Sequence, residues 1–160
     1  MRDGPRVLGM GVEIEVLRDR DVTDDMVKAF ERLLPQLSRS APALDAAALR
    51  ELVAFPGNRM LIARVKGEIV GTLTLVMFPI PTGLRAWIED VVVDSSARGQ
   101  GVGAALTREA VRLAEAAGAR TVDLTSRPSR EAANRLYERL GFRLRDSKVY
   151  RYAAPQEWDS

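Results

Sequence analysis

Apolar and polar positions alternate along several stretches of the chain, and this pattern predicts strands. Val12–Leu17 sets Val, Ile and Val around Glu13 and Glu15, as is typical of a half-exposed strand. Similar apolar or alternating runs lie at Arg59–Val65, Ile69–Phe78, Arg85–Val93, Thr121–Thr125, Phe142–Leu144 and Val149–Tyr152. Lys66-Gly67 indicates a tight hairpin turn between the first two of these later runs, and residues 79–83, with two prolines and a glycine, indicate a loop.

Apolar positions that recur every three to four residues predict helices between these strands. Candidate N-caps precede three of the helices, at Thr23 or Asp24, at Asp45 and at Ser129. Gly118 and Gly141 are placed to end the last two helices, and Pro35 should kink or end the first. The order β-α-α-β-β-β-α-β-α-β-β predicts an α/β (α+β) fold, with a mixed central sheet of about six to seven strands flanked by about four helices.

The chain has the length of one domain. Its 160 residues are enough to bury a core, and no internal repeat or low-complexity segment interrupts them. We expect residues 1–11 to form a flexible N-terminal segment, residues 12–152 a single domain, and residues 153–160 a flexible tail.

A glycine-rich loop, Arg98-Gly99-Gln100-Gly101-Val102-Gly103-Ala104, stands between a predicted strand and a predicted helix. The first N–H groups of a helix have no partner within the helix and carry a partial positive charge, so they bind anions. The glycines let a ligand approach the backbone closely, and the Arg98 guanidinium suits a phosphate. The loop therefore predicts a phosphate site.

Other glycine-rich sites fit less well. A P-loop needs Lys followed by Ser or Thr after its last glycine, and Val102-Gly103-Ala104 has neither. The dinucleotide-binding pattern G-x-G-x-x-A does fit, with Asp123 about twenty residues further on. That pattern follows its strand directly, however, and residues 94–98 intervene here. A loop that binds no ligand is the remaining alternative.

The residues that are missing limit the chemistry. With no Cys and no His, the chain has no disulfide, thiolate nucleophile, imidazole base or His-ligated metal. Its net charge of +2 is too small to predict a nucleic-acid partner. We expect catalysis by carboxylates, Tyr or backbone dipoles without a metal, and, from the lack of a signal-peptide core or a membrane-spanning run, a cytoplasmic protein that does not bind membranes.

Two segments resemble the signatures of the GNAT superfamily of N-acetyltransferases. Arg98-x-x-Gly101-x-Gly103 is similar to the acetyl-CoA signature Q/R-x-x-G-x-G/A, and Ala133–Phe142 is similar to A-x-x-L-Y-E-x-x-G-F. The resemblance implies a GNAT fold and transfer of acetyl from acetyl-CoA to a primary amine in a ternary complex. A non-catalytic acyl-CoA-binding module is one alternative, and a nucleotide-linked oxidoreductase is a second.

The resemblance also implies where the co-substrate binds. The pantetheine arm would pair with the backbone of Val91, Val92 and Val93, between two splayed parallel strands, and the pyrophosphate would lie on the N–H groups of residues 98–104. Many members carry an Asn two turns before the signature Tyr, where this chain has Arg130. Asn134, one turn before that Tyr, is the candidate replacement.

Two residues are candidates for proton transfer. The resemblance implies that Tyr137 protonates the departing thiolate; its alternative role is that of a packed core tyrosine. Glu89 is the candidate base for the incoming ammonium, because it shares strand parity with Trp87 and Val91 and partial burial would raise its proton affinity. Asp90 is the rival, since a bulge there would change the face on which it lies. A water chain without a single base also stays open.

The acceptor is expected to be a small-molecule or peptide amine, and a homodimer is an open alternative for the assembly. The resemblance also implies that residues 26–53 and 78–87 form the acceptor pocket, as the corresponding segments do in the family. These segments are mainly apolar, with Arg39, Arg50 and Arg85 as candidate partners for an acidic acceptor.

Overall fold

The computed structural model describes residues 4–8 and 11–155, which divide into two compact units, Met1–Thr125 and Ser126–Ser160. Most of the helices and strands belong to the first unit: β1 (Arg6–Leu8), β2 (Val12–Val16), α1 (Asp24–Leu37), α2 (Ala46–Ala54), β3 (Asn58–Val65), β4 (Glu68–Ile80), β5 (Gly83–Val93), α3 (Val102–Ala116) and β6 (Thr121–Asp123). The short 3-10 turns η1 (Asp19–Asp21) and η2 (Ser95–Ala97) complete it. The second unit contains α4 (Glu131–Arg139).

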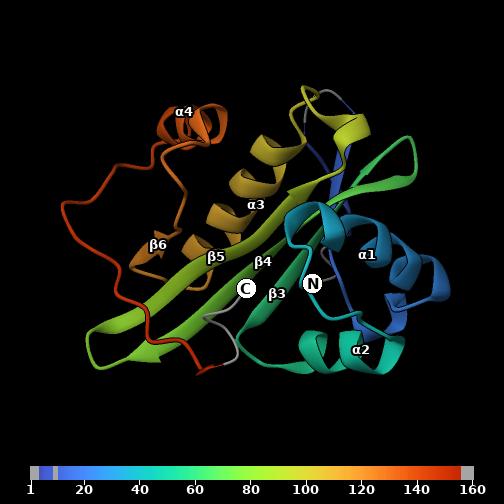
Figure 1. Cartoon of the computed structure of the whole chain (residues 1–160), viewed down its shortest axis with the longest axis horizontal. Coiled ribbons are helices and arrows are strands. Elements are labelled where there is room, and N and C mark those ends of the chain that lie inside the picture. Colours follow the sequence, from blue (N-terminus) through green and yellow to red (C-terminus); the bar gives the residue numbers. More distant parts are fainter. Residues whose placement is uncertain (1–3, 9–10, 156–160) are drawn as a thin grey trace. The chain divides into compact units, whose positions relative to one another are not determined.

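The six described strands form one mixed sheet in the order β1-β2-β3-β4-β5-β6, of which Figure 1 labels β3 to β6. Neighbouring strands from β1 to β5 are antiparallel, while β6 lies parallel to β5 after the crossover through α3. The expected mixed sheet with about four helices is therefore confirmed.

The sequence signals at the helix ends work as predicted in the first unit. The Thr23 hydroxyl accepts the Met26 N–H at 3.3 Å to begin α1, and the Asp45 carboxylate accepts the Ala48 N–H at 2.8 Å to begin α2. Gly118, with φ +86°, ends α3 by turning the chain into the left-handed region. Pro35 does not stop α1 at once, because α1 continues to Leu37.

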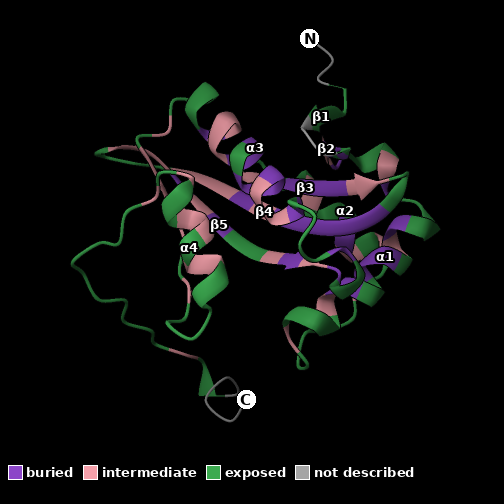
Figure 2. Cartoon of the chain, turned by 90° about the horizontal axis from the view of Figure 1, so that it is seen from above, coloured by how far each residue is buried: buried purple, intermediate pink, exposed green. Residues whose placement is uncertain are grey.

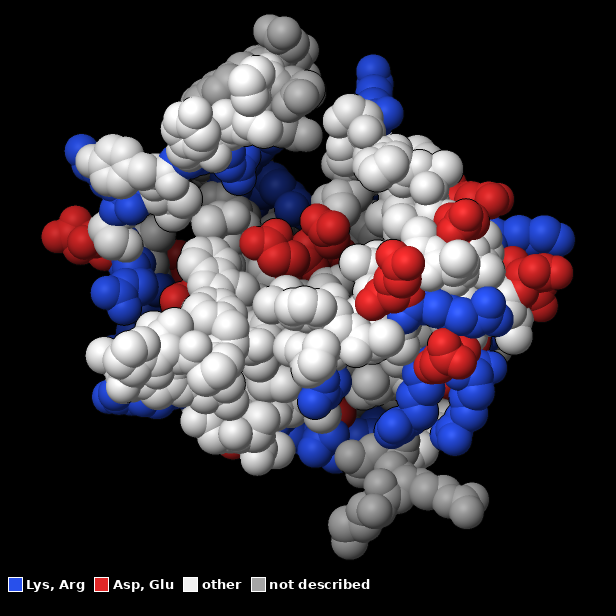
Figure 3. All heavy atoms as spheres, turned by 90° about the horizontal axis from the view of Figure 1, so that it is seen from below, with Lys and Arg blue, Asp and Glu red and all other residues white. Residues whose placement is uncertain are grey.

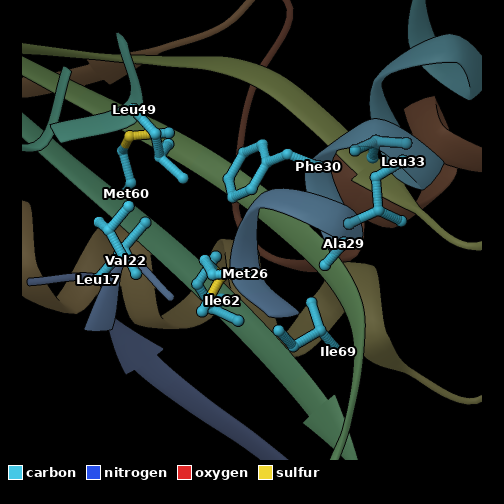
Figure 4. Close-up of a cluster of buried hydrophobic side chains, with 11 residues drawn as sticks. Leu17, Val22, Met26, Ala29, Phe30, Leu33, Leu49, Met60, Ile62 and Ile69 are labelled. Atoms are coloured by element: carbon cyan, nitrogen blue, oxygen red, sulfur yellow. The ribbon is translucent and has the colours of Figure 1, made fainter. Parts of the chain in front are cut away.

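Both faces of the sheet are covered, which explains the long apolar runs in β3 and β4. Figure 2 shows α1 and α3 on opposite sides of strands whose residues are largely buried. On the α1 side, Phe30 and Leu33 pack with Leu49 of α2 and Ile62 of β3 (Figure 4). These side chains are almost completely removed from water, so this cluster holds α1 and α2 against the sheet.

Both predicted hairpin positions contain turns. Lys66 and Gly67 have φ values of +50° and +81°, the left-handed pair of a two-residue turn whose twist matches that of the strands. The loop expected over residues 79–83 is shorter than predicted. β4 runs through Pro79 to Ile80 and β5 begins at Gly83, so Pro81 and Thr82 alone connect two long strands.

Three expectations for the chain ends are corrected or lie outside the described residues. The flexible segment expected over residues 1–11 contains a strand, because Arg6–Leu8 pair with Val12–Ile14 as β1. The strands expected at Phe142–Leu144 and Val149–Tyr152 do not form. Leu144 and Tyr152 are 97% and 94% exposed, and the second unit has no described strand that could pair with them, so strand propensity alone is insufficient. Residues 156–160 of the expected tail lie outside the described residues.

Candidate active site

A β-bulge in β5 decides where the two candidate carboxylates lie. Thr72 pairs with Val92 and Thr74 with Glu89, so three steps along β5 match two along β4. The backbone of Asp90 has φ +48°, a left-handed conformation that Asp tolerates better than most residues. The extra residue places Glu89 on the same face of the sheet as Val92, and not with Val91 as simple alternation predicts.

The bulge opens onto a cavity of about 130 Å³ within the first unit. Its walls come from α1, the segment before α2, α2 itself and strands β3 to β5, and comprise Phe30, Leu34, Leu44, Leu52, Met60, Thr72, Thr74, Glu89 and Asp90. Phe30, Met60 and Thr72 are buried, whereas Glu89 and Asp90 are exposed. The partial burial expected for Glu89 is therefore wrong, because Glu89 lies on the exposed side of the cavity. Figure 3 shows a group of acidic side chains near the centre of one face.

The open edge of β5 lies beside this bulge. Parallel pairing joins Arg85–Trp87 to Thr121–Asp123 of β6 and stops there. Val92 and Val93 still pair with β4, but in the described part of the first unit no strand pairs with them on the β6 side. Their peptide groups on that side are left for another partner, as docking of a pantetheine arm between splayed strands requires.

The glycine-rich loop has the geometry of an anion site. Gly99 and Gly101 have φ values of +79° and +80°, and a Cβ at either position would meet no atom within 4 Å. The first helical bond of α3 runs from the Ala105 N–H to the Gly101 carbonyl at 3.0 Å, so the N–H groups of residues 102–104 precede the helical ladder. The loop therefore presents backbone donors with open space above its glycines, and it fits a pyrophosphate.

Some of the candidate cofactor-binding residues of the loop can offer a ligand only their peptide groups, and others also have exposed side chains. The Val102 side chain is buried and lies beside Gly71 of β4, so only its peptide group is available to a ligand. Arg98 and Gln100 are exposed, and the Gln100 amide donates to the Ser96 carbonyl at 3.5 Å. Gly103 and Ala104 occupy the first turn of α3.

A hydrogen-bond network that sequence reasoning missed holds the start of this loop to α1. The Arg32 guanidinium donates to the Asp94 carboxylate at 3.0 Å and to the Ile69 carbonyl at 2.6 Å. Asp94 also accepts the Ser96 N–H at 3.0 Å, and the Gln36 side chain accepts the Ser95 N–H at 3.0 Å. The Asp-Ser-Ser run is a local signal for this turn, but Arg32 is 62 positions away in the chain and gives no such signal.

Hydrogen bonding lowers the pKa of Asp94. The Ser96 backbone N–H has the largest effect, the Ser96 hydroxyl and Arg32 act in the same direction, and burial opposes them. Asp94 is thus held as a carboxylate at the point where β5 leads into the glycine-rich loop.

Two of the candidate residues, Tyr137 and Asn134, belong to α4 of the second unit. The Tyr137 ring packs edge-on against Phe142 with centroids 5.9 Å apart. Burial raises the pKa of Tyr137 above its ordinary value of 10.0, and the Arg130 cation opposes that shift, so the phenol is protonated at neutral pH. Asn134 donates to the Arg127 carbonyl at 3.1 Å and orders the turn before α4. Arg130, not Ser129, is the N-cap residue of this helix.

The basic residues considered for an acidic acceptor do not line the cavity. Arg50 donates to the Val22 carbonyl at 3.2 Å, and Arg85 donates to the Thr82 hydroxyl at 2.9 Å. Neither these two nor Arg39 is among the residues that form its walls. Within residues 4–8 and 11–155, no cluster of three or more Asp, Glu, His or Cys side chains could bind a metal ion, and no helix has the length and apolar character to cross a membrane.

Comparison with known proteins identifies the class. The model of the acetyltransferase (GNAT) family matches residues 23–142. A glucosamine 6-phosphate N-acetyltransferase of Trypanosoma brucei brucei is 32% identical over 146 residues, which cover 86% of this chain and 93% of the relative. This chain therefore belongs to the GNAT family, and the dinucleotide-binding alternative is wrong.

Two further relatives act on other acceptors according to their names. An N-alpha-acetyltransferase of Arabidopsis thaliana is 33% identical over 87 residues, or 54% of this chain and 45% of the relative. The crystal structure of a ribosomal-protein-alanine N-acetyltransferase from Brucella melitensis biovar Abortus 2308 has a TM-score of 0.68 and 26% identity, covering 89% of this chain and 99% of that one. The protein is a GNAT N-acetyltransferase, a family that uses acetyl-CoA, and its relatives differ in the amine that accepts the acetyl group.

The Asp94 network generates a prediction about acid stability. Since the folded-state pKa of Asp94 lies below its ordinary value of 3.8, the carboxylate stabilises the fold above about pH 4 and loses this effect as the pH falls through the folded-state pKa. Asp94→Asn should lower the free energy of unfolding by about 1–2 kcal/mol at neutral pH, with a smaller difference from the parent at an acid pH below 3.8. Urea unfolding at both pH values measures this. An equal loss at both would show that the carboxylate charge is not responsible.

Proposed function

We propose that the acceptor amine enters the cavity beside the β5 bulge and attacks the acetyl-CoA thioester directly. The observation that carries this proposal is the bulge itself, which turns Glu89 and Asp90 toward a cavity next to the open edge of β5. An amine and a thioester held on the two sides of one strand react with the advantage of proximity. Direct attack also agrees with a chain that has no Cys to carry the acetyl group.

The glycine-rich loop would hold the pyrophosphate of acetyl-CoA, and the backbone of Val91–Val93 would hold its pantetheine arm. Acetyl-CoA supplies the activated acetyl group. The donors of the first turn of α3 fit the negative charge, and the glycines leave room for it. A peptide N–H near Val91 would polarise the thioester carbonyl as negative charge develops on its oxygen.

Glu89 would act as the base and Tyr137 as the acid. Glu89 takes one proton from the ammonium, which frees the nitrogen lone pair to form the C–N bond, and the nitrogen loses its second proton as the C–S bond breaks. Tyr137 returns a proton to the thiolate that leaves. Glu89 is favoured over Asp90 because Glu89 pairs with Thr74 on the cavity face, whereas Asp90 has no paired residue in β4. The family signature supports the role of Tyr137, and its raised pKa keeps the phenol proton in place at neutral pH. The homodimer and the cytoplasmic location stay predictions.

A pair of glycine variants tests the acetyl-CoA site. Gly101 and Gly118 stand at opposite ends of α3 with φ values of +80° and +86°, and both have open space around a Cβ. Glu at either position should therefore cost a similar backbone strain of about 1–2 kcal/mol. Only Gly101→Glu should abolish acetyl-CoA binding in calorimetric titration and the accompanying rise in melting temperature. Unchanged binding by folded Gly101→Glu would place the pyrophosphate elsewhere.

A matched pair of carboxylate variants tests the base. Glu89→Gln should lower kcat about 10²- to 10⁴-fold and remove the acidic limb of the pH–rate profile, because the base must be deprotonated to act. Asp90→Asn should keep that limb, and Asn also tolerates the left-handed backbone at this position. If Asp90→Asn loses the acidic limb and Glu89→Gln keeps it, Asp90 is the base. If both variants keep the parent pH–rate profile, water accepts the proton of the ammonium.

Tyr137→Phe removes one oxygen and keeps the ring that packs on Phe142. If Tyr137 is the acid, kcat at saturating acetyl-CoA should fall about 10²- to 10⁴-fold with little change in acetyl-CoA affinity. Tyr152→Phe, at a residue that is 94% exposed, is the control and should keep its activity. A Tyr137→Phe protein that loses about 1 kcal/mol of stability but turns over normally would make Tyr137 a packing residue.

A further inference from the structure

The residues that line the cavity indicate which class of acceptor it can bind. This inference about the acceptor rests on the proposed function. Five of its nine wall residues are apolar, two are Thr and two are acidic, and none is Lys or Arg. The buried members form an apolar floor with Phe30 and Met60, which are 2% and 5% exposed. The carboxylates are the exposed members, so charge and apolar surface are separated within one cavity.

The polar groups other than the carboxylates offer little to a polyhydroxylated ligand. The buried Thr72 hydroxyl already donates to the Leu61 carbonyl at 2.9 Å. The second hydroxyl group in the cavity walls belongs to Thr74. Leu34, Leu44 and Leu52 form the remaining apolar surface. A sugar placed here would leave several hydroxyl groups against apolar side chains without partners, which is unfavourable.

The size of the cavity limits the apolar group that it accepts. An apolar cavity of about 150 Å³ in another protein binds benzene. The volume here, about 130 Å³, therefore suits one medium-sized group such as a branched aliphatic side chain.

The charge of the cavity limits the rest of the ligand. Glu89 and Asp90 attract an ammonium group, and they repel a carboxylate or phosphate bound within a few ångströms of it. Because no cation lines the cavity, nothing in its walls would offset this repulsion. The relative with 32% identity is named for a phosphorylated acceptor, and the cavity walls of this chain do not favour that class.

We propose that the acceptor is a primary ammonium attached to one medium-sized apolar group, with no phosphate or carboxylate beside the amine. The ammonium lies against Glu89 and Asp90, and the apolar group lies on the floor formed by Phe30 and Met60. This chemistry occurs in a free apolar amine and at the N-terminus of a peptide whose first side chain is apolar.

Equilibrium binding in the presence of CoA tests this proposal without any acetyl transfer. We expect leucinamide to bind at least tenfold more tightly than glycinamide, which lacks the apolar group, and at least tenfold more tightly than leucine, which adds a carboxylate. Glucosamine 6-phosphate should bind at least 100-fold more weakly than leucinamide. A short peptide that begins with Leu distinguishes the two sources: tighter binding than leucinamide indicates a peptide acceptor, and weaker binding indicates a free amine.

Two matched variants locate the binding site. Leu37 and Leu52 are equally exposed at 38%, but only Leu52 lines the cavity. Leu52→Arg should weaken leucinamide binding at least tenfold, and Leu37→Arg should leave it unchanged. If Leu52→Arg does not fold, Leu52→Asn provides the same comparison through loss of apolar contact. Equal affinities of the two folded variants would overturn the placement of the ligand.

The outcomes separate this inference from the proposed function. Glucosamine 6-phosphate that binds as tightly as leucinamide, or a complete set of compounds that fails to bind, would overturn the inference. If glucosamine 6-phosphate were then acetylated with normal release of CoA, the acceptor inference would be wrong but the proposed acetyl-transfer function would stand. Leucinamide that binds as expected, without release of CoA from acetyl-CoA, would support the inference and contradict the direct-attack function.

Discussion

The extra residue in β5 determines on which face of the sheet the Glu89 carboxylate lies. Strands β4 and β5 pair regularly on both sides of the bulge, so the irregularity is confined to the stretch that follows Glu89. The left-handed backbone of Asp90 is uncommon outside glycine, and it persists because the paired strands hold it on both sides. Without the bulge, alternation would place Glu89 and Val92 on opposite faces, and the carboxylate would be separated from the apolar cluster that Val92 joins.

The loop that follows β5 depends on a second long-range constraint. Asp94 is hydrogen-bonded through its own backbone to Val70 of β4 at 2.7 Å and through its side chain to Arg32 of α1. Because α1 also supplies Phe30 and Leu34 to the cavity, one helix contacts both the acceptor side and the segment that leads to the glycine-rich loop. Under the proposed function, α1 would therefore support the positions of both substrates, as reaction by proximity requires.

The second unit contributes through local order. Gly141 follows α4 with φ +97°, and the Phe142 N–H returns to the Tyr137 carbonyl at 3.0 Å. This bond and the ring contact hold the signature Tyr beside Phe142, so the last part of the signature has a structural explanation. At the other end of α4, the hydrogen bond from Asn134 to the Arg127 carbonyl orders the turn that precedes the helix.

The sequence by itself determined the elements whose signals are local. Strand alternation, the caps Thr23 and Asp45 and the left-handed turn at Lys66-Gly67 depend on near neighbours, and the two signatures were sufficient to indicate the family. Only the tertiary structure decided the bulge at Asp90, the Arg32–Asp94 contact and the apolar cavity, because each depends on pairing or packing between segments far apart in the chain. The same reason explains the strands that did not form at residues 142–144 and 149–152: strand propensity is expressed only where a neighbouring strand accepts the hydrogen bonds and covers the apolar side chains.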